Sequence, residues 1–295
     1  MTNRNFSAII NQIESFPALP LTVNRVMAVA GNPESSARDM MQAIIADQAM
    51  CSTILKIANS AFFGLPRQVA SIDKAVVVLG FDEIRNIVLA KAVFSSFQKL
   101  SKNNKEGITL FWEHSFTCAL AAKIMAEHLG FSASEFFIAG LLHDIGKLAL
   151  LISFPFDYQL LAEPLEANTL RTTGREFELY QTSHDKVGML LLRRWMLPEQ
   201  LLMATGFHHQ PNLAPSLPIY PIVVQLADML ALLHYSPDQL QPEDVVTIFA
   251  DFLPECTSLW QANGLPWDPQ QVGLWFARLI DSRQNDQAIL DILIS

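Results

Sequence analysis

The sequence has few cysteines and few basic residues, and both shortages exclude classes of protein. Its 3 cysteines, Cys51, Cys118 and Cys256, are widely separated and odd in number, which predicts reduced thiols rather than a disulfide framework. Lysine and arginine together number 20 against 29 aspartates and glutamates, and no basic run is present. A formal net charge of −9 would repel a phosphate backbone, so direct binding to nucleic acid is not expected.

The sequence also lacks a signal peptide and an uninterrupted apolar run. Residues 1–6, Met-Thr-Asn-Arg-Asn-Phe, contain no basic region followed by an apolar stretch. The two most apolar stretches carry polar residues in their middles, His143 and Asp144 in one and Asp228 in the other, which is unlike a membrane span. We therefore expect a cytoplasmic protein that does not contact a membrane.

Strand-like alternation is almost absent, and the hydrophobic residues, 51% of the chain, recur with a helical period. The apolar residues of 19–30 fall on one helix face, and Gly80 separates two further helical segments. The polar stretch Ser101–Gly107 is the best internal boundary, because residues without apolar spacing cannot bury a face. We expect an all-α protein with a helical part over residues 1–100, a helical core over 108–235 and a helical extension over 236–295 whose role stays open.

Short motifs predict where individual helices begin. Ser36 with Asp39, and Ser132 with Glu135, match the capping box, in which each side chain accepts a hydrogen bond from the other residue's backbone. The helix that begins after Ser132 is expected to carry His143 well inside it.

Five of the seven histidines fall into one ordered series with two aspartates. The members are His114, His143, Asp144, His184, His208, His209 and Asp228. Imidazole and carboxylate groups together suit divalent iron, manganese, nickel or zinc, so the series predicts a metal site. A single buried histidine is more often a core residue hydrogen-bonded to the backbone, and we give His128 and His234 that interpretation or a place on the surface.

Residues beside the series admit more than one interpretation. Asp144 could simply accept backbone hydrogen bonds, and Lys147 could be a solvated helix residue. Asp185 follows His184 at an expected helix start, where the helix dipole favours an acid, so we expect a surface residue rather than a ligand. Gly146 permits close packing of the helix that carries it.

The order of this series resembles the HD superfamily of metal-dependent phosphohydrolases. Further motifs resemble one branch of it, the HDOD family of bacterial HD-related output domains, which are regarded as signalling and regulatory modules. These motifs are Phe16–Pro20, Asp47–Gln48, Ala58–Gly64, Ser71–Ala75 and Leu79–Phe81. The resemblance covers roughly residues 6–235 and is specific, because several separate motifs recur in the same order.

The resemblance implies a site for one or two divalent ions. A first ion would be held by His114, His143, Asp144 and Asp228. His184, His208 and His209 would hold a second ion, with Asp144 as the bridge and as a candidate catalytic residue. Lys147 would be the other catalytic residue, placed to neutralise a phosphate oxygen.

Two functions from different classes follow from the resemblance. The first is a signal-transduction protein that acts through a protein partner and retains the metal site. The alternative is an active phosphohydrolase on a nucleotide or another small phosphorylated ligand. Hydrolysis of cyclic dinucleotides is not expected, because Gln210 and Pro211 stand where that branch has Gly-Tyr-Pro after its paired histidines. The short connector predicts that the N-terminal helices pack against the core as one cooperative unit.

Overall fold

The structure is a computed structural model that describes residues 6–60, 63–65, 67–100, 105–154, 173–235, 240–241, 244–248, 256–285 and 287–294. Within these ranges the chain forms helices and no strands, which confirms the expected all-α fold. Contacts between residues divide the chain into two compact units. Unit 1 contains residues 1–16 and 106–281, and unit 2 contains residues 17–105 and 282–295.

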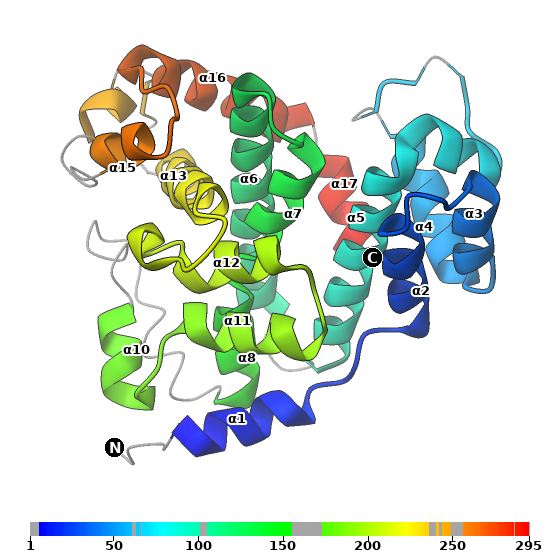
Figure 1. Ribbon diagram of the computed structural model, residues 1–295, viewed down its shortest axis with the longest axis horizontal. Helices are drawn as coiled ribbons and strands as arrows, with labels where there is room; N and C mark the ends of the chain where they lie inside the picture. The colour runs from blue at the N-terminus through cyan, green and yellow to red at the C-terminus, as the bar shows by residue number, and fades with distance from the viewer. Residues whose placement is uncertain are drawn as a thin grey trace. The chain divides into compact units, whose positions relative to one another are not determined.

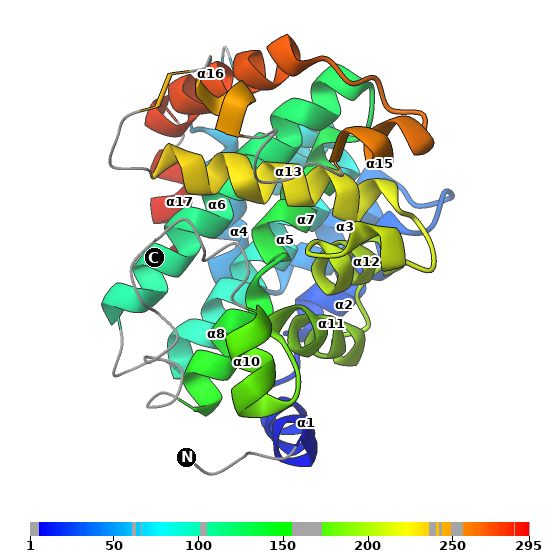
Figure 2. The same ribbon diagram turned by 90° about the vertical axis from the view of Figure 1, so that its left-hand side faces the viewer.

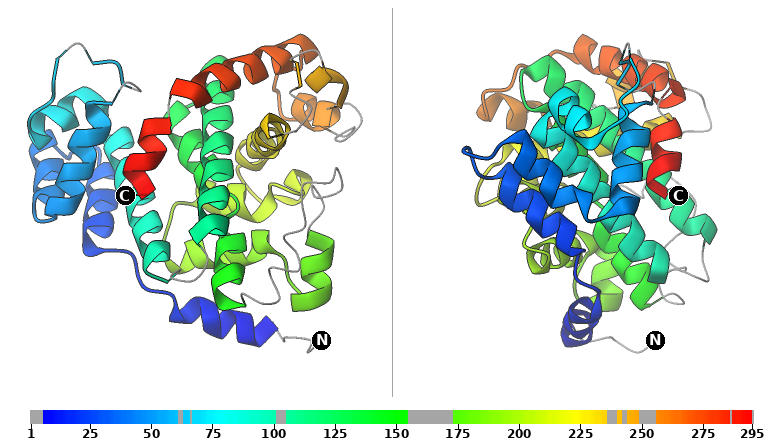
Figure 3. Two further views of the ribbon diagram at one scale, coloured as in Figure 1. Left: turned by 180° about the vertical axis from the view of Figure 1, so that it is seen from behind. Right: turned by 90° about the vertical axis from the view of Figure 1, so that its right-hand side faces the viewer.

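Unit 2 is built around a long helix. Its helices are α2 (Leu21–Ala30), α3 (Ala37–Ile45), α4 (Gln48–Ala58), α5 (Ile72–Leu100) and α17 (Gln287–Ile294). Helices α2, α3 and α4 all pack against α5, and the C-terminal α17 lies against α4 and α5, as Figure 3 shows in red. The ammonium of Lys91 donates a hydrogen bond to the backbone oxygen of Leu293 at 3.1 Å, which ties α5 to α17.

Local signals in unit 2 act as the sequence predicts. The capping box at Ser36 is formed, with its backbone nitrogen donating to Asp39 Oδ2 at 2.8 Å and its hydroxyl accepting from the backbone nitrogen of Asp39. Asp47 caps α4 by accepting a hydrogen bond from the backbone nitrogen of Met50 at 2.9 Å. Gly80 adopts a φ of 82°, a left-handed conformation that kinks α5 where the sequence predicts a break.

Unit 1 is a helical assembly in which helices that are near and far apart along the chain pack together. Its elements are α1 (Phe6–Ser15), α6 (Lys105–Leu129), α7 (Ala133–Leu142), α8 (Ile145–Ser153), α10 (Thr173–Tyr180), α11 (His184–Arg194), α12 (Glu199–Phe207), η2 (Pro211–Leu213), α13 (Ile219–His234), α15 (Cys256–Ala262) and α16 (Pro269–Asn285). Helix α11 packs between α8 and α12, and α12 packs against α7 and α13 (Figure 1). Helix α13, seen lengthwise in Figure 2, also contacts α7 and α15.

Each end of the chain belongs to a different unit from the residues next to it in the sequence: residues 1–16 to unit 1 and residues 282–295 to unit 2. Helix α1 belongs to unit 1, where it contacts α8 and α11, and Arg194 Nη2 donates to the backbone oxygen of Phe16 at 2.9 Å. The stretch 17–105 of unit 2 ends within the polar segment that we took as a boundary, of which residues 101–104 lie outside the described part. Packing of the N-terminal helices against the core stays a prediction.

The C-terminal extension contributes to unit 1 as far as residue 281. Trp275 on α16 meets the ring of His128 edge-on at 5.6 Å, which accounts for that histidine without a metal. Arg278 Nη2 lies 2.5 Å from Glu127 Oε2, so α16 is joined to α6 by an ion pair as well.

In the part of the chain that the structure describes, one helical stretch, Ala133–Ser153, is long and apolar enough to cross a membrane, with a mean hydropathy of 1.6. Of its most apolar window, 72% is buried inside the structure. The core helix of a soluble protein passes the same test of length and composition, and burial therefore accounts for the apolar character of this stretch.

The turn after α11 generates a stability prediction. The backbone nitrogens of Met196 and Leu197 donate to the backbone oxygens of Arg193 and Leu192, which is the Schellman pattern. Met196 occupies its left-handed position with a φ of 56° and a 77% exposed side chain. Met196→Gly should raise the free energy of unfolding by about 0.5–1 kcal/mol, because a left-handed L-residue is strained and little packing is lost.

Chemical denaturation of the purified protein measures this change. The control is Arg193→Gly in the last turn of α11, which should lower the free energy of unfolding by about 1 kcal/mol through loss of helix propensity. A Met196→Gly protein less stable than the wild type would contradict the prediction.

Candidate metal centre

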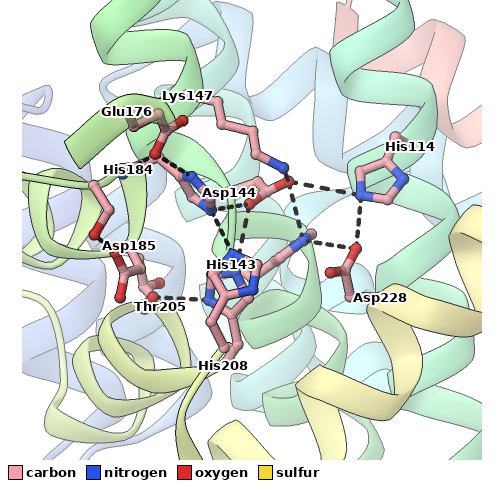
Figure 4. Close-up of polar contacts among 12 residues, drawn as sticks. His114, His143, Asp144, Lys147, Glu176, His184, Asp185, Thr205, His208 and Asp228 are labelled. Carbon is pink, nitrogen blue, oxygen red and sulfur yellow. Dashed lines mark hydrogen bonds and ion pairs between the residues drawn. The ribbon is translucent and has the colours of Figure 1, made fainter. Parts of the chain in front are cut away.

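The structure brings all seven residues of the predicted metal series together in unit 1. Figure 4 shows most of them converging around Asp144. His114 comes from α6, the pair His143-Asp144 from the junction of α7 and α8, and His184 from the first position of α11. His208 and His209 follow the end of α12, and Asp228 comes from α13.

The junction that carries His143 differs from the prediction. Helix α7 ends at Leu142 and α8 begins at Ile145, so the pair lies between helices instead of well inside one. Asp144 leaves the helical conformation with φ −100° and ψ 10°. The apolar period continues across the junction, which is why the sequence does not reveal the break.

The predicted capping box at the start of α7 is wrong. Ser132 occupies the N-cap position but makes no side-chain capping bond. Glu135 instead accepts a hydrogen bond from the hydroxyl of Tyr220 at 2.5 Å. A partner on α13 therefore competes successfully for the carboxylate that the local motif requires.

Four ligand atoms meet at what we call the first metal position, formed by His114, His143, Asp144 and Asp228. Asp228 Oδ1 lies 3.0 Å from His114 Nε2 and 3.4 Å from His143 Nε2. Asp144 Oδ2 lies 3.7 Å and 3.3 Å from the same two nitrogens. All four atoms lie within 4.8 Å of one another.

Four ligand atoms also meet at the second metal position, formed by Asp144, His184, His208 and His209. Asp144 Oδ1 lies 3.1 Å from His184 Nε2 and 3.6 Å from His208 Nε2. His209 Nε2 lies 2.8 Å from His184 Nε2. Asp144 thus turns one oxygen towards each position, which is the geometry of a bridging carboxylate.

The donor atoms fit divalent ions. Ligands held 2.0–2.2 Å from a common ion lie about 3–3.6 Å apart, close to the separations in both groups. Buried side-chain atoms without a hydrogen-bond partner gather here: His114 Nε2, His143 Nε2, Asp144 Oδ1, His208 Nε2 and Asp228 Oδ1. Such atoms cost free energy unless an ion or water satisfies them.

Hydrogen bonds to the far side of two rings select the nitrogen that faces the centre. His143 Nδ1 lies 2.7 Å from the backbone oxygen of Gly140, and His208 Nδ1 lies 2.9 Å from that of Thr205. A carbonyl oxygen only accepts, so each Nδ1 carries the proton. The Nε2 atoms are therefore the ones available to a metal ion.

Glu176 is a residue of this site that the sequence does not reveal. Its carboxylate, 1% exposed, accepts hydrogen bonds at 2.7 Å from both the backbone nitrogen and Nδ1 of His184. Glu176 lies on α10, in a stretch that reads as a polar connector. Nothing in the sequence distinguishes it from Glu178, which is exposed.

Lys147 and Asp185 each form specific polar contacts and are not simply solvated surface residues. The Lys147 ammonium lies 2.5 Å from Asp144 Oδ2, and 27% of its side chain is exposed. Asp185 is buried, so its expected place on the surface is wrong. Its carboxylate accepts from the hydroxyl of Ser183 and lies 3.2 Å from Lys186 Nζ, and it belongs to neither metal position.

The two site aspartates are held in the ionised form. Burial alone would raise the pKa of Asp144, but His143 and Lys147 hold that pKa well below its ordinary value. Burial opposes the ionised form of Asp228 in the same way, and the neighbouring rings of His114 and His143 hold its pKa well below the usual range. Both carboxylates are consequently available to a cation at neutral pH.

The histidines are shifted in opposite directions. Burial would lower the pKa of His143 and of His184, but Asp144 raises the first well above its ordinary value. Glu176 raises the pKa of His184 to about 9. Burial lowers the pKa of His208. A metal ion at the second position would therefore replace a proton on His184 while meeting a neutral His208.

A glycine contact sets the spacing between Asp144 and His184. A Cβ atom at Gly146 would lie 1.9 Å from the backbone oxygen of His184 and 2.6 Å from the backbone nitrogen of Gly188. Helices α8 and α11 can approach this closely only because Gly146 has no side chain, which confirms the predicted close packing.

A comparison with protein-family models identifies the fold. The HDOD domain matches residues 16–211, about two thirds of the chain. The chain belongs to the HDOD family. The predicted family is thus confirmed, and the match includes six of the seven metal-series residues, with Asp228 beyond it.

Three solved structures share the fold. A candidate phosphohydrolase from Shewanella amazonensis SB2B has a TM-score of 0.76 at 22% identity, with 97% of this chain and 98% of that chain covered. An HDOD domain protein of unknown function from Geobacter sulfurreducens has a TM-score of 0.75 at 21% identity, covering 97% and 98%. A candidate signal transduction protein from Marinobacter aquaeolei VT8 has a TM-score of 0.75 at 20% identity, covering 100% and 67%.

Two curated relatives are longer than this chain. An uncharacterised protein from Treponema pallidum is 24% identical over 216 residues, which are 72% of this chain and 41% of the relative. Ribonuclease Y from Thermus thermophilus is 34% identical over 119 residues, which are 40% of this chain and 16% of the relative. The matched part of the chain therefore spans less than half the length of either protein.

The glycine contact predicts a large effect of one methyl group. Gly146→Ala should lower the free energy of unfolding by about 1–3 kcal/mol or more, because backbone atoms of α11 must move to admit the Cβ. Gly31→Ala is the control, since Gly31 is exposed with an ordinary φ of −81° and its nearest atom would lie 3.3 Å away. Chemical denaturation compares the two, and equal effects would contradict the proposed role of Gly146.

Proposed function

We propose that the protein is a bacterial HDOD-type signal-transduction protein whose site holds one or two divalent metal ions. The observation that carries this proposal is the meeting of five buried nitrogen and oxygen atoms that lack a hydrogen-bond partner, one of them Asp144 Oδ1 and the other four around it. Iron, manganese, nickel and zinc all accept this mixture of imidazole and carboxylate ligands. We expect the protein to work in the cytoplasm.

Regulation is favoured over catalysis by the number of ligands that the protein offers. Four protein ligand atoms meet at each metal position. Structural zinc sites are held by four protein ligands, whereas catalytic zinc sites keep one coordination position open for water or substrate. The name of the Marinobacter aquaeolei structure supports a role in signalling, and we propose that the protein acts through a protein partner.

The alternative function is metal-dependent hydrolysis of a nucleotide or another small phosphoester. Lys147 favours it, because its side chain is partly exposed and its ammonium could leave Asp144 Oδ2 to bind a phosphate oxygen. Bound metal ions would supply Lewis acidity and make a water molecule acidic enough to attack phosphorus. The names of the Shewanella amazonensis structure and of Ribonuclease Y support this alternative, although the net charge of −9 disfavours a nucleic-acid substrate.

Removal of the shared carboxylate separates the two functions. Asp144→Ala should abolish metal binding at both positions, because Asp144 supplies an oxygen to each. Unit 2 should stay folded, since the substitution lies in unit 1. If the protein regulates through a partner, the variant should still bind that partner in a pull-down and retain biological activity in a complementation assay.

The control is Asp82→Ala, which removes a 60% exposed acid from unit 2 and should change neither metal content nor activity. Elemental analysis and matched protein abundance accompany both variants. Complete loss of biological activity in Asp144→Ala, with normal abundance, folding and partner binding, would favour hydrolysis over regulation.

Metal binding should release protons. The pKa of His184 is about 9, so its ring is protonated at pH 7 in the metal-free protein. An ion at the second position requires a free Nε2, and the apparent affinity should therefore rise as the pH rises from 7 towards 9. Calorimetric titration with Zn²⁺ at pH 7, in two buffers of different ionisation enthalpy, should show release of about one proton or more. Affinity that stays constant over this range would contradict the assignment.

The same shift has the opposite effect on the metal-free fold. Because folding raises the pKa of His184 above that of an unfolded histidine, its contribution to stability is fully present below about pH 6.5. That contribution is lost as the pH rises through about 9. High pH should thus weaken the metal-free protein while it strengthens metal binding.

A further inference from the structure

We infer that Glu176 is a positioning residue for the second metal position, and that it links helix α10 to the filling of that position. The inference rests on the proposed metal binding and assigns a further residue to the same site. Its basis is the contact between the Glu176 carboxylate and His184 (Figure 4).

A single oxygen of Glu176 holds His184 at two points. Glu176 Oε2 lies 2.7 Å from both the backbone nitrogen and the ring Nδ1 of His184. The main chain and the ring are therefore fixed together, which orients the opposite ring nitrogen. That nitrogen, Nε2, lies 3.1 Å from Asp144 Oδ1 and 2.8 Å from His209 Nε2.

The partner of His184 differs in kind from those of the other oriented rings. His143 and His208 each donate to a backbone carbonyl three residues earlier, at the end of their own helix. His184 receives a charged acceptor from a separate helix, eight residues away in the sequence. A carboxylate behind a metal-binding imidazole holds the ring in place and increases its basicity.

Helix α10 turns two buried side chains towards the interior. Glu176 and Tyr180, one helical turn apart, are each 1% exposed, whereas Phe177 between them is 62% exposed. Tyr180 stacks on Phe154 with the ring centres 5.6 Å apart. The Glu176–His184 contact therefore connects α10 to a metal ligand.

Through this contact, the docking of α10 and the binding of an ion at the second position should stabilise each other. An ion at the second position requires His184 in the orientation that Glu176 stabilises, so the ion should also stabilise α10 in its docked place. Thermodynamic linkage requires the converse by the same factor: a change that displaces α10 must lower the affinity of the second position for its ion. The outer face of α10, which includes the exposed residues Phe177 and Glu178, would thus move less when metal is bound.

Zinc titration of two matched variants tests the positioning role. Glu176→Gln keeps the shape of the side chain but removes its charge, whereas Glu178→Gln makes the same change on an exposed residue of the same helix. Both are made in an Asp228→Asn protein, which lacks a ligand of the first position only. Glu176→Gln should weaken Zn²⁺ binding about 10–100-fold. Glu178→Gln should leave it unchanged.

Hydrogen exchange of the wild-type protein and of the Glu176→Gln protein tests the link to α10. Zn²⁺ should slow exchange of the backbone amides of α10, and Glu176→Gln should remove most of this protection while circular dichroism shows an intact helical fold. Unchanged exchange of α10 in the wild type would overturn the link, even if Glu176→Gln failed to fold.

The outcomes separate this inference from the function on which it rests. Equal Zn²⁺ affinity of the Glu176→Gln and Glu178→Gln proteins would overturn the role of Glu176 and leave the metal site intact. A wild-type protein that takes up neither Zn²⁺ nor any other divalent ion would overturn both.

Discussion

The buried carboxylate of Asp144 is the group on which the arrangement of unit 1 depends. An ionised carboxylate that is 1% exposed would be costly by several kcal/mol if it stood alone. Its compensation comes from the adjacent His143, from Lys147 one turn later and from His184 on another helix. Helices α6, α8, α11, α12 and α13, or the residues that follow them, bring the other side chains of the site to this carboxylate.

The sequence predicts the donor set of this centre better than its geometry. Histidines and aspartates are recognisable by type and order, so His114, His143 and Asp228 could be selected without a structure. Glu176 could not, because its role depends on which face of a short helix is buried. The burial of Asp185 and the break after Leu142 are likewise consequences of tertiary packing, which a local helical period does not report.

The histidines at this centre are not equivalent, and their surroundings explain why. Carboxylates raise the pKa of His143 and of His184, whereas burial lowers the pKa of His208 in spite of the nearby Asp144. Protons and metal ions therefore compete most directly where negative charge is concentrated. Site charge is thus set by neighbours a few ångströms away and is independent of the overall charge of −9.

The division of the chain into units has a consequence for how the protein can be cut. Unit 2 takes its last helix from the C-terminus, and unit 1 takes its first helix from the N-terminus. A gene fragment ending near residue 100 would express unit 2 without α17, leaving the faces of α4 and α5 that it covers open to water. A fragment beginning near residue 108 would likewise lack α1 along α8 and α11. Neither unit is encoded by a continuous stretch of the gene, so fusions and truncations that respect the fold must keep both termini.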